Sequence, residues 1–587
     1  MEFTLVAVLG VISIVAVAAF SERLGLAAPL SLVLVGIGLS FIPGVPHPDV
    51  EPELILAGVL PPLLYSAAVN MPVTDFRRDL GTISGLAVTL VALSTLGAGV
   101  LFHWLLPEIG WPAAFALGAV ISPTDAVAAT SVGKRLGLPH RLLTVLEGEG
   151  LVNDASALVL LRTAVAAFAG SFSIWATVGE FLYAVVVAVA VGLVVGLVNV
   201  RLRALLNDAV LNTAISFVVP FIAYLPAEEL NASGVLAVVI AGLVTGHQSP
   251  RYLRANDRIA ESTNWHTAAF LLESGMFLLM GLSVKTLVDE VRAEDLSVAR
   301  ALLIGLVAAA FVMLARLLFI VPLVAGMRRD VAKASQSKER IEALQQVLKN
   351  PEENPDFAER MRNLPEKRIE GFRKRVTRKS ADIEFTVNQY FGARGGLILG
   401  WAGMRGAITV AAAQTLPEDT PDRAQLILIA FVVAATTLLL QGLTLPMVIR
   451  KVGVPEDDPQ QLREEGARLM NALGESATDF LENPALTDKA GEPYPQRLIE
   501  FVRSDARVEA QRKAGDGRKQ REGAPSRYEA GSRDQFLELR LRVLAVQREE
   551  LLKARSSGTY SSLTLGKAQH VLDVDAARFE QLESSGH

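Results

Sequence analysis

The chain has 587 residues, 51% of them hydrophobic, and a mean hydropathy of +0.37, which is typical of a membrane protein with a soluble remainder. The net charge of −5 is small and no basic tract suits nucleic acid, so no nucleic-acid partner is expected. Cysteine is absent, which excludes disulfides, thiolate metal sites and cysteine catalysis.

Apolar stretches follow one another from residue 3 to about residue 450. We interpret each as a helix that crosses the membrane, although some of them, 28–43 and 232–247 most of all, are shorter than the ~20 residues that a crossing usually needs. The predicted spans are 3–20, 28–43, 53–70, 80–106, 112–132, 141–169, 174–200, 207–226, 232–247, 264–287, 298–326, 391–416 and 424–450. The sequence therefore predicts an all-α integral membrane protein with thirteen transmembrane helices, surrounded by membrane lipid.

Charges in the connecting loops alternate along the chain. With the N-terminus outside, the inner loops hold most of the Lys and Arg, among them Arg77, Arg78 and Arg141, and the outer loops hold mostly acids. Lys and Arg concentrate on the cytoplasmic side of membrane proteins. This pattern predicts a multi-pass protein of the cell (plasma) membrane with its N-terminus outside and its C-terminus in the cytoplasm.

Two charged segments interrupt or follow the apolar region. The transmembrane domain is predicted to comprise 1–326 and, as its last two helices, 391–455, with a cytoplasmic helical insertion at 327–390 between them. A helical tail, 456–587, follows. The tail is interpreted either as a plain helical extension or as a regulatory domain that takes a ligand or a protein partner.

Thirteen spans allow two inverted repeats, with spans one to six matched to spans eight to thirteen. Span five then corresponds to span twelve, and each contains a polar or helix-breaking segment, Ser122-Pro-Thr-Asp125 in one and Gly400-Trp-Ala-Gly-Met-Arg-Gly406 in the other. Paired interrupted helices at matching positions indicate the binding site of a secondary transporter. We therefore expect two discontinuous helices that cross inside the membrane.

Two carboxylates are predicted to lie deep in the membrane. Asp125 and Asp154 each lie about thirteen residues into their spans, from opposite sides, so at ~1.5 Å per residue they can meet in the middle. A carboxylate survives there only if it faces a polar interior, which by default indicates an ion or proton site. The alternatives are a structural role for Asp154 and, for Asp125, the capping of a half-helix.

A second group of polar residues is interpreted as structural. Glu149 and Asn153 are four residues apart on one face of span six, and Arg316 in span eleven is a buried cation that needs an anion. A Glu149–Arg316 pair bridged by Asn153 satisfies all three. Arg405 either holds carbonyls of a broken helix or tunes the acid site, and Glu273 is assigned to interhelix packing.

These residues together resemble the monovalent cation:proton antiporters, on the sodium/proton exchanger branch. The resemblance rests on the segments Ser122–Asp125, Glu149–Asp154 and Gly403–Ala407 together with Arg316, and it covers about 3–450. It implies a homodimer, two inverted repeats and elevator-type alternating access. It also implies that Asp154 binds the cation and the proton in turn.

The same resemblance assigns further residues. It implies that Thr124 and Asp125 complete the cation site, with Glu149, Asn153 and Arg316 in a stabilising cluster. Relatives usually have an acid where this chain has Ser66, so Ser66 or water is expected to replace that ligand. An Asn before the key Asp resembles the electroneutral exchangers.

The expected activity is antiport of sodium or lithium against protons in pH and sodium homeostasis, without a cofactor and without enzymatic chemistry. Burial disfavours the charged form of Asp154 and a bound cation favours it, so the two ligands compete. Potassium/proton exchange at the same site is the first alternative. The others are a cation channel gated by the tail, for which no selectivity loop is evident, and a membrane sensor that signals through the tail.

Overall fold

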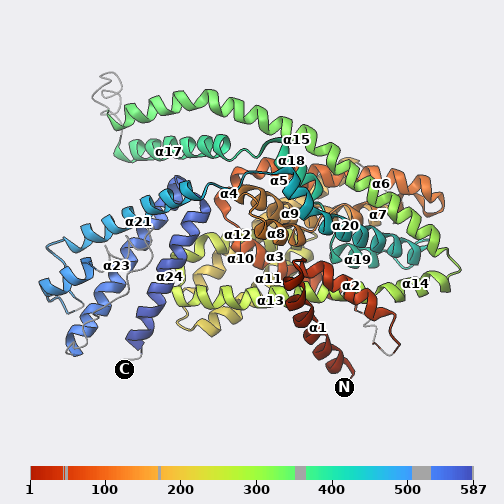
Figure 1. Cartoon of the computed structure of the whole chain (residues 1–587), viewed down its shortest axis with the longest axis horizontal. Coiled ribbons are helices and arrows are strands. Elements are labelled where there is room, and N and C mark those ends of the chain that lie inside the picture. Colours follow the sequence, from red (N-terminus) through yellow and green to blue (C-terminus); the bar gives the residue numbers. More distant parts are fainter. Residues whose placement is uncertain are drawn as a thin grey trace.

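The computed structural model describes residues 2–43, 45, 50–169, 174–350, 365–488, 490–504 and 530–584. Across these residues the secondary structure is helical, and the only β-structure is an isolated bridge between Thr487 and Pro493. The predicted all-α fold is therefore confirmed for the described part of the chain. A dense bundle of apolar helices forms one side of the molecule, and the tail helices lie beside it (Figure 1).

Helices cover every stretch that the sequence predicts to be apolar and spanning. In the first half of the chain they are α1 (Glu2–Leu24), α2 (Ala28–Ser40), α3 (Leu60–Asn70), α4 (Val73–Arg78), α5 (Leu80–Ser84), α6 (Val91–Leu105), α7 (Gly110–Ile121), α8 (Val127–Arg135), α9 (His140–Ala166), α10 (Ile174–Arg203), α11 (Ala209–Glu229) and α12 (Gly234–Tyr252). Short π-helical turns, Leu54–Val59 and Gly85–Leu90, lead into α3 and α6.

The second half of the bundle continues with longer helices and one further interruption. Its members are α13 (Ala255–Leu282), α14 (Val284–Ala293), α15 (Val298–Lys349), α17 (Glu366–Asn388), α18 (Gly392–Trp401), α19 (Ala407–Gln414) and α20 (Arg423–Val452). The tail contributes α21 (Pro459–Leu481), α23 (Ala530–Ser557) and α24 (Ser562–Ser584). The number of membrane crossings remains a prediction.

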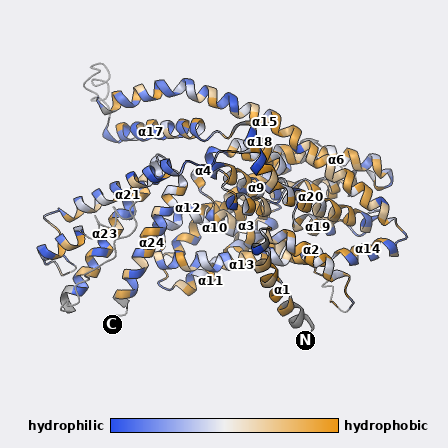
Figure 2. Cartoon of the chain, viewed as in Figure 1, coloured by the Kyte–Doolittle hydropathy of each residue, from blue (hydrophilic) through white to orange (hydrophobic). Residues whose placement is uncertain are grey.

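Apolar composition supports a membrane location for the bundle. Six helices in the described residues are long and apolar enough to cross a bilayer, and shorter apolar helices such as α2 and α7 accompany them. Large apolar side chains on α10 and α11, including Val186, Val194 and Val210, are more than half exposed. Figure 2 shows apolar residues concentrated in the bundle and polar residues on α17, α21 and α23. Outward-facing apolar side chains of this kind are stable against lipid.

Two spans are broken, as the sequence predicts. The helix of span five stops at Ile121 and resumes as α8 at Val127, and the helix of span twelve stops at Trp401 and resumes as α19 at Ala407. Pro123 favours the first break, because proline has no N–H with which to continue the helical hydrogen bonds. Non-helical backbone at membrane depth is tolerated where protein or a polar cavity surrounds it.

The insertion that the sequence predicts at 327–390 is continuous with the helix before it. The predicted boundary at residue 327 falls inside α15, which runs without interruption through 52 residues. The insertion therefore begins as a direct extension of a membrane helix. Beyond it, α17 packs back along α15, as Figure 1 shows.

The tail forms its own small core and docks on the bundle. Leu469, Leu473, Leu544 and Leu572 are among the buried residues that pack α21, α23 and α24 together. α24 lies against α13. Two arginines provide polar links across this contact, because Arg258 pairs with Asp573 and Arg548 donates to the carbonyls of Pro250 (2.7 Å) and Leu253 (2.6 Å).

Candidate functional site

The two interrupted helices cross at their breaks. The backbone N–H of Asp125 donates to the carbonyl of Met404 over 2.7 Å, which joins one extended segment to the other. A Cβ atom on Gly406 would collide with Oδ2 of Asp125, so only glycine permits this approach. The segments that the sequence singled out in spans five and twelve are thus brought into direct contact.

Charged side chains complement two of the four half-helix ends created by the breaks. Oδ1 of Asp125 accepts from the backbone N–H of Val127 at 2.8 Å, at the N-terminus of α8. Arg405 donates from Nε to the carbonyl of Ile121 (3.1 Å), at the C-terminus of α7, and from Nη1 to the carbonyl of Gly403 (2.6 Å). A carboxylate at a helix N-terminus and a cation at a C-terminus both stabilise the helix dipole. Of the two roles considered for Arg405, the structure shows the contact with broken-helix carbonyls.

A buried ion pair lies beside the crossing. Glu149 on α9 and Arg316 on α15 form a bidentate pair, with Nη2 of Arg316 2.8 Å from Oε2 of Glu149. Nε of Arg316 also donates to the carbonyl of Leu399, near the end of α18 (3.0 Å). Both side chains are almost fully buried. Arg316 thus ties the second broken helix to α9.

Thr124 connects this ion pair to Asn153. The Thr124 hydroxyl donates to Oε1 of Glu149 (2.7 Å) and accepts from Nδ2 of Asn153 (3.1 Å), while the Thr124 carbonyl accepts from the same Nδ2 (2.6 Å). The sequence predicts that Asn153 bridges Glu149 and Arg316 directly, but the link passes through Thr124. Oδ1 of Asn153 is buried and lacks a hydrogen-bond partner among the described residues.

Asp154 differs from these neighbours in having no hydrogen bond from any residue that the structure describes. Its side chain is buried, and it lies within electrostatic reach of Asp125. One turn earlier on α9, Gly150 lets Ala126 approach closely, because a Cβ on Gly150 would lie 3.1 Å from the Ala126 Cβ. The free carboxylate of Asp154 therefore lies close to the first broken segment, beside a cluster whose polar groups are largely paired.

One acid near the crossing was assigned by sequence to packing. Glu273 on α13 also interacts electrostatically with Asp125, and no described residue bonds to its carboxylate. Its signal in the sequence is an acid inside an apolar span with no obvious cation partner. Since α13 is distant in the chain from α8 and α9, spacing alone could not place it there.

Ser66 is the site residue that the structure supports least. It is buried on α3, where its carbonyl accepts from Asn70 (2.9 Å), and it makes no hydrogen bond to Asp125 or Asp154. Within the described residues no group of three or more His, Asp or Glu side chains is arranged to hold a metal ion. Any cation here would be cargo held by few protein oxygens.

Comparison with known proteins identifies a family and several relatives that are similar to this chain. The family described as "Sodium/hydrogen exchanger, transmembrane" matches residues 10–451. An uncharacterised Na⁺/H⁺ exchanger of Mycobacterium tuberculosis is 29% identical over 585 residues, covering 98% of this chain and 96% of the relative. A sodium, potassium, lithium and rubidium/H⁺ antiporter of Bacillus pumilus is 33% identical over 289 residues, covering 47% of this chain and 43% of the relative.

A solved structure shares the fold. The sodium proton antiporter MjNhaP1 of Methanocaldococcus jannaschii superimposes with a TM-score of 0.54 at 16% identity, over 77% of this chain and all of that one. The family match extends over most of the chain and includes both broken helices and the Glu149–Asp154 segment. The chain therefore belongs to the sodium/hydrogen exchanger family, and it is a secondary transporter, not an enzyme.

Proposed function

We propose that this protein exchanges one monovalent cation, sodium or lithium, for one proton, and that Asp154 binds the two in turn. The proposal rests mainly on the lack of a hydrogen-bond partner for the Asp154 carboxylate among the described residues. This carboxylate is buried, while Thr124, Glu149 and Arg316 beside it are bonded to one another. An unpaired buried carboxylate is costly unless it is protonated or holds a cation.

Competition for one carboxylate gives coupled exchange. With a proton or a cation bound, the site is neutral, and the neutral loaded states cross the low-dielectric barrier most easily. The empty, charged site does not cross. The cation enters and the proton leaves, or the reverse, because both neutralise the same group. Asn153 carries no charge, so the stoichiometry we propose is electroneutral.

Asp125 and Thr124 are proposed as further cation ligands. Oδ1 of Asp125 accepts a hydrogen bond from the Val127 N–H, so Oδ2 can bind a cation. The hydroxyl oxygen of Thr124 lies in the same broken segment. Ser66 remains a proposed ligand, although it is not bonded to either acid. Glu149, Asn153, Arg316 and Arg405 are proposed to hold the broken helices in register around the site.

The proposed cycle is elevator-type alternating access in a homodimer of the plasma membrane, with two inverted repeats of thirteen spans, the N-terminus outside and the C-terminus in the cytoplasm. The family resemblance and the crossing of α7–α8 with α18–α19 support this proposal. Exchange by such a protein would serve pH and sodium homeostasis.

Potassium is the second candidate cation. The relative from Bacillus pumilus is named for sodium, potassium, lithium and rubidium. The acid that relatives usually carry at the position of Ser66 is absent here. Fewer fixed oxygens select less strictly by cation size, which favours a broader range.

A proteoliposome assay tests the proposal. Proton flux is followed by fluorescence dequenching on addition of sodium, lithium, potassium or rubidium, with and without a membrane potential clamped by valinomycin. We expect flux with sodium and lithium at a rate that the clamp does not change. A rate that follows the imposed potential would refute electroneutrality, and conductance without proton coupling would favour a channel.

A further inference from the structure

A basic cavity lies where the tail meets the transport domain. Its volume is about 590 Å³, and its walls come from the ends of α4 and α12, from α17 of the insertion and from α23 of the tail. These elements are far apart in the sequence, so the cavity exists only when the tail is docked. It is separate from the crossing of the broken helices.

The charge of the cavity is strongly unbalanced. Six permanent cations line it and the only carboxylate among the lining residues is Glu549. The cations are Arg77, Arg78, Arg251, Arg378, Lys553 and Arg555. Like charges that line one cavity repel one another unless an anion compensates them.

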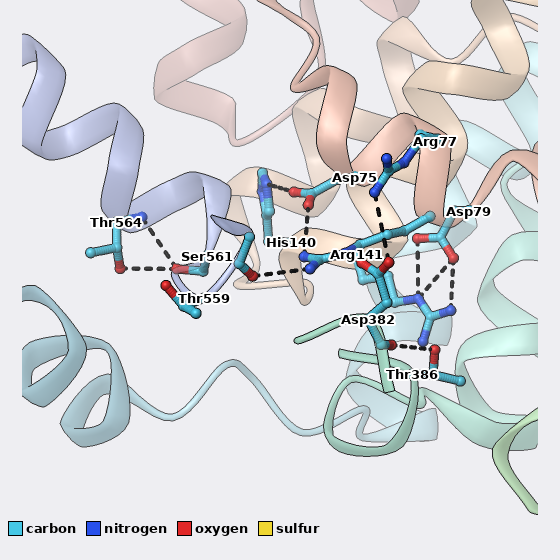
Figure 3. A network of polar contacts seen from close by, with 12 residues as sticks. Asp75, Arg77, Asp79, His140, Arg141, Asp382, Thr386, Thr559, Ser561 and Thr564 are labelled. Atoms are coloured by element: carbon cyan, nitrogen blue, oxygen red, sulfur yellow. Dashed lines mark hydrogen bonds and ion pairs between the residues drawn. The ribbon is translucent and has the colours of Figure 1, made fainter. Parts of the chain in front are cut away.

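Half of these cations already have partners within the protein. Arg78 donates to Asp382 (2.7 Å) and to the carbonyl of Gly558 (3.0 Å), and Arg77 lies 3.7 Å from the same Asp382 (Figure 3). Lys553 is 3.4 Å from Glu549. One aspartate is thus shared by two arginines, and the Lys553 pair is internal to α23.

The other three, Arg251, Arg378 and Arg555, have no hydrogen bond or ion pair with any residue that the structure describes. The guanidinium of Arg251 lies over the ring of the adjacent Tyr252, 5.6 Å from its centroid. Arg555 is half-buried, and burial together with the nearby Arg258 lowers its pKa. Asp573, whose charge also acts on Arg555, is already paired with Arg258.

We propose that this cavity binds an anion carrying two or more phosphate groups, held by Arg251, Arg378 and Arg555. Guanidinium groups match phosphate oxygens in a two-pronged geometry, and a single monovalent anion would leave most of the positive charge uncompensated. The ligand is a soluble polyphosphate or the headgroup of an anionic lipid, since both present the same chemistry. Bound there, it links the tail to the cytoplasmic-side ends of α4 and α12.

The proposal is tested by binding to the full-length protein in detergent, with inorganic triphosphate as the probe in isothermal titration calorimetry. Arg378→Gln and Arg555→Gln should each raise the dissociation constant at least about tenfold, as expected when a charge-assisted hydrogen bond is lost. The matched control is Arg375→Gln, because Arg375 is on the same helix, is exposed, and bonds only to the carbonyl of Gly371. This control should bind as the parent does.

A second arm identifies the source of the phosphate. The protein is placed in nanodiscs of phosphatidylcholine alone or with added cardiolipin, and its thermal unfolding is compared. Stabilisation by cardiolipin that both variants abolish assigns the site to lipid, and binding of triphosphate alone assigns it to a soluble ligand. Either result supports the proposal.

The unfolding temperature of the Arg555→Gln protein without ligand distinguishes a structural role of Arg555 from a role in binding. In phosphatidylcholine nanodiscs, Arg555→Gln should unfold at the parent's temperature or above it, because it removes repulsion with Arg258. A fall in that temperature, affinities that are unchanged in both variants, or the absence of any effect of triphosphate and cardiolipin would each overturn the proposal. None of these outcomes depends on which cation the protein exchanges.

Discussion

At the scale of single residues, the buried polar side chains around Asp154 are of two kinds, those that are hydrogen-bonded to one another and one that is not. Glu149, Arg316 and Thr124 satisfy one another, whereas Asp154 has no bonded partner among the described residues. A cluster of the first kind fixes positions of the backbone. A carboxylate of the second kind can exchange ligands, because no protein group competes for it.

The substitution Asp154→Asn removes the titratable group while keeping the shape of the side chain. We expect cation-dependent proton flux in proteoliposomes to fall to the level of empty liposomes. Asp289→Asn is the control, since that acid is exposed near the end of α14 and should leave the flux unchanged. Full activity in a well-folded Asp154→Asn protein would remove Asp154 from the mechanism.

The pair of Glu149 and Arg316 allows a test of stability that does not involve transport. Arg316→Met leaves Glu149 as an unpaired buried charge, which costs about 3–5 kcal/mol. The double variant Glu149→Gln with Arg316→Met leaves no charge and should be clearly more stable than Arg316→Met alone. Thermal unfolding in detergent measures both. A double variant less stable than either single one would show that the two side chains act independently.

At the scale of elements, one helix crossing depends on two glycines. Gly36 on α2 and Gly281 on α13 face each other, and a Cβ on Gly281 would lie 2.5 Å from the Val33 carbonyl oxygen and 2.8 Å from the Gly36 Cα. Small residues at such a crossing let two membrane helices approach closely. The contact brings α13, and with it Glu273, against the bundle.

Gly281→Ala should therefore destabilise the protein, by about 1–3 kcal/mol as for other overpacked sites, and lower its unfolding temperature. Gly275→Ala provides the control on the same helix, because a Cβ there meets nothing within 4 Å. Equal unfolding temperatures for the two variants would mean that α2 and α13 separate without cost.

Much of the element-level picture could be predicted from the sequence. Hydrophobic length located the helices of the bundle, and Pro123 and the glycines of 400–406 indicated the two breaks. The hydrogen bond from Asp125 to Met404 and the link through Thr124 could not be predicted, since they depend on how distant helices meet. The continuity of α15 was missed for another reason: a change from apolar to charged composition marks the membrane surface, not the end of a helix.

At the scale of the whole molecule, the tail contacts both the insertion and the transport domain. Arg78, at the end of α4, bonds to Asp382 on α17 and to Gly558 after α23. Nothing in the spacing of the tail sequence predicts these contacts, because amphipathic helices can pack against one another or against another surface. The docked position of the tail is therefore a result of the structure.

Asp573→Asn should loosen the docked tail. Asp573 accepts from Nε of Arg258 (3.0 Å) and from Gln569 (2.8 Å), so its loss removes the carboxylate that pairs with Arg258 and that acts on the charge of Arg555. Hydrogen exchange should accelerate in α24. In the control, Glu482→Gln, an exposed pair with Arg503 at 3.5 Å is lost and exchange should not change. Unchanged protection in Asp573→Asn would place the anchoring elsewhere in the interface.

The unbroken α15 gives the insertion a mechanical property. The helix continues 23 residues past the predicted boundary at residue 327, which is about 35 Å at ~1.5 Å per residue. The part of α15 within the membrane contains Arg316, which donates a hydrogen bond to the carbonyl of Leu399 on α18. Pro322 lies between Arg316 and this extension, and the helix continues through it. A tilt of about 5° carried along that length moves the far end by ~3 Å. When the membrane part of α15 tilts, the far end of the insertion therefore moves further than the residues around the candidate site do.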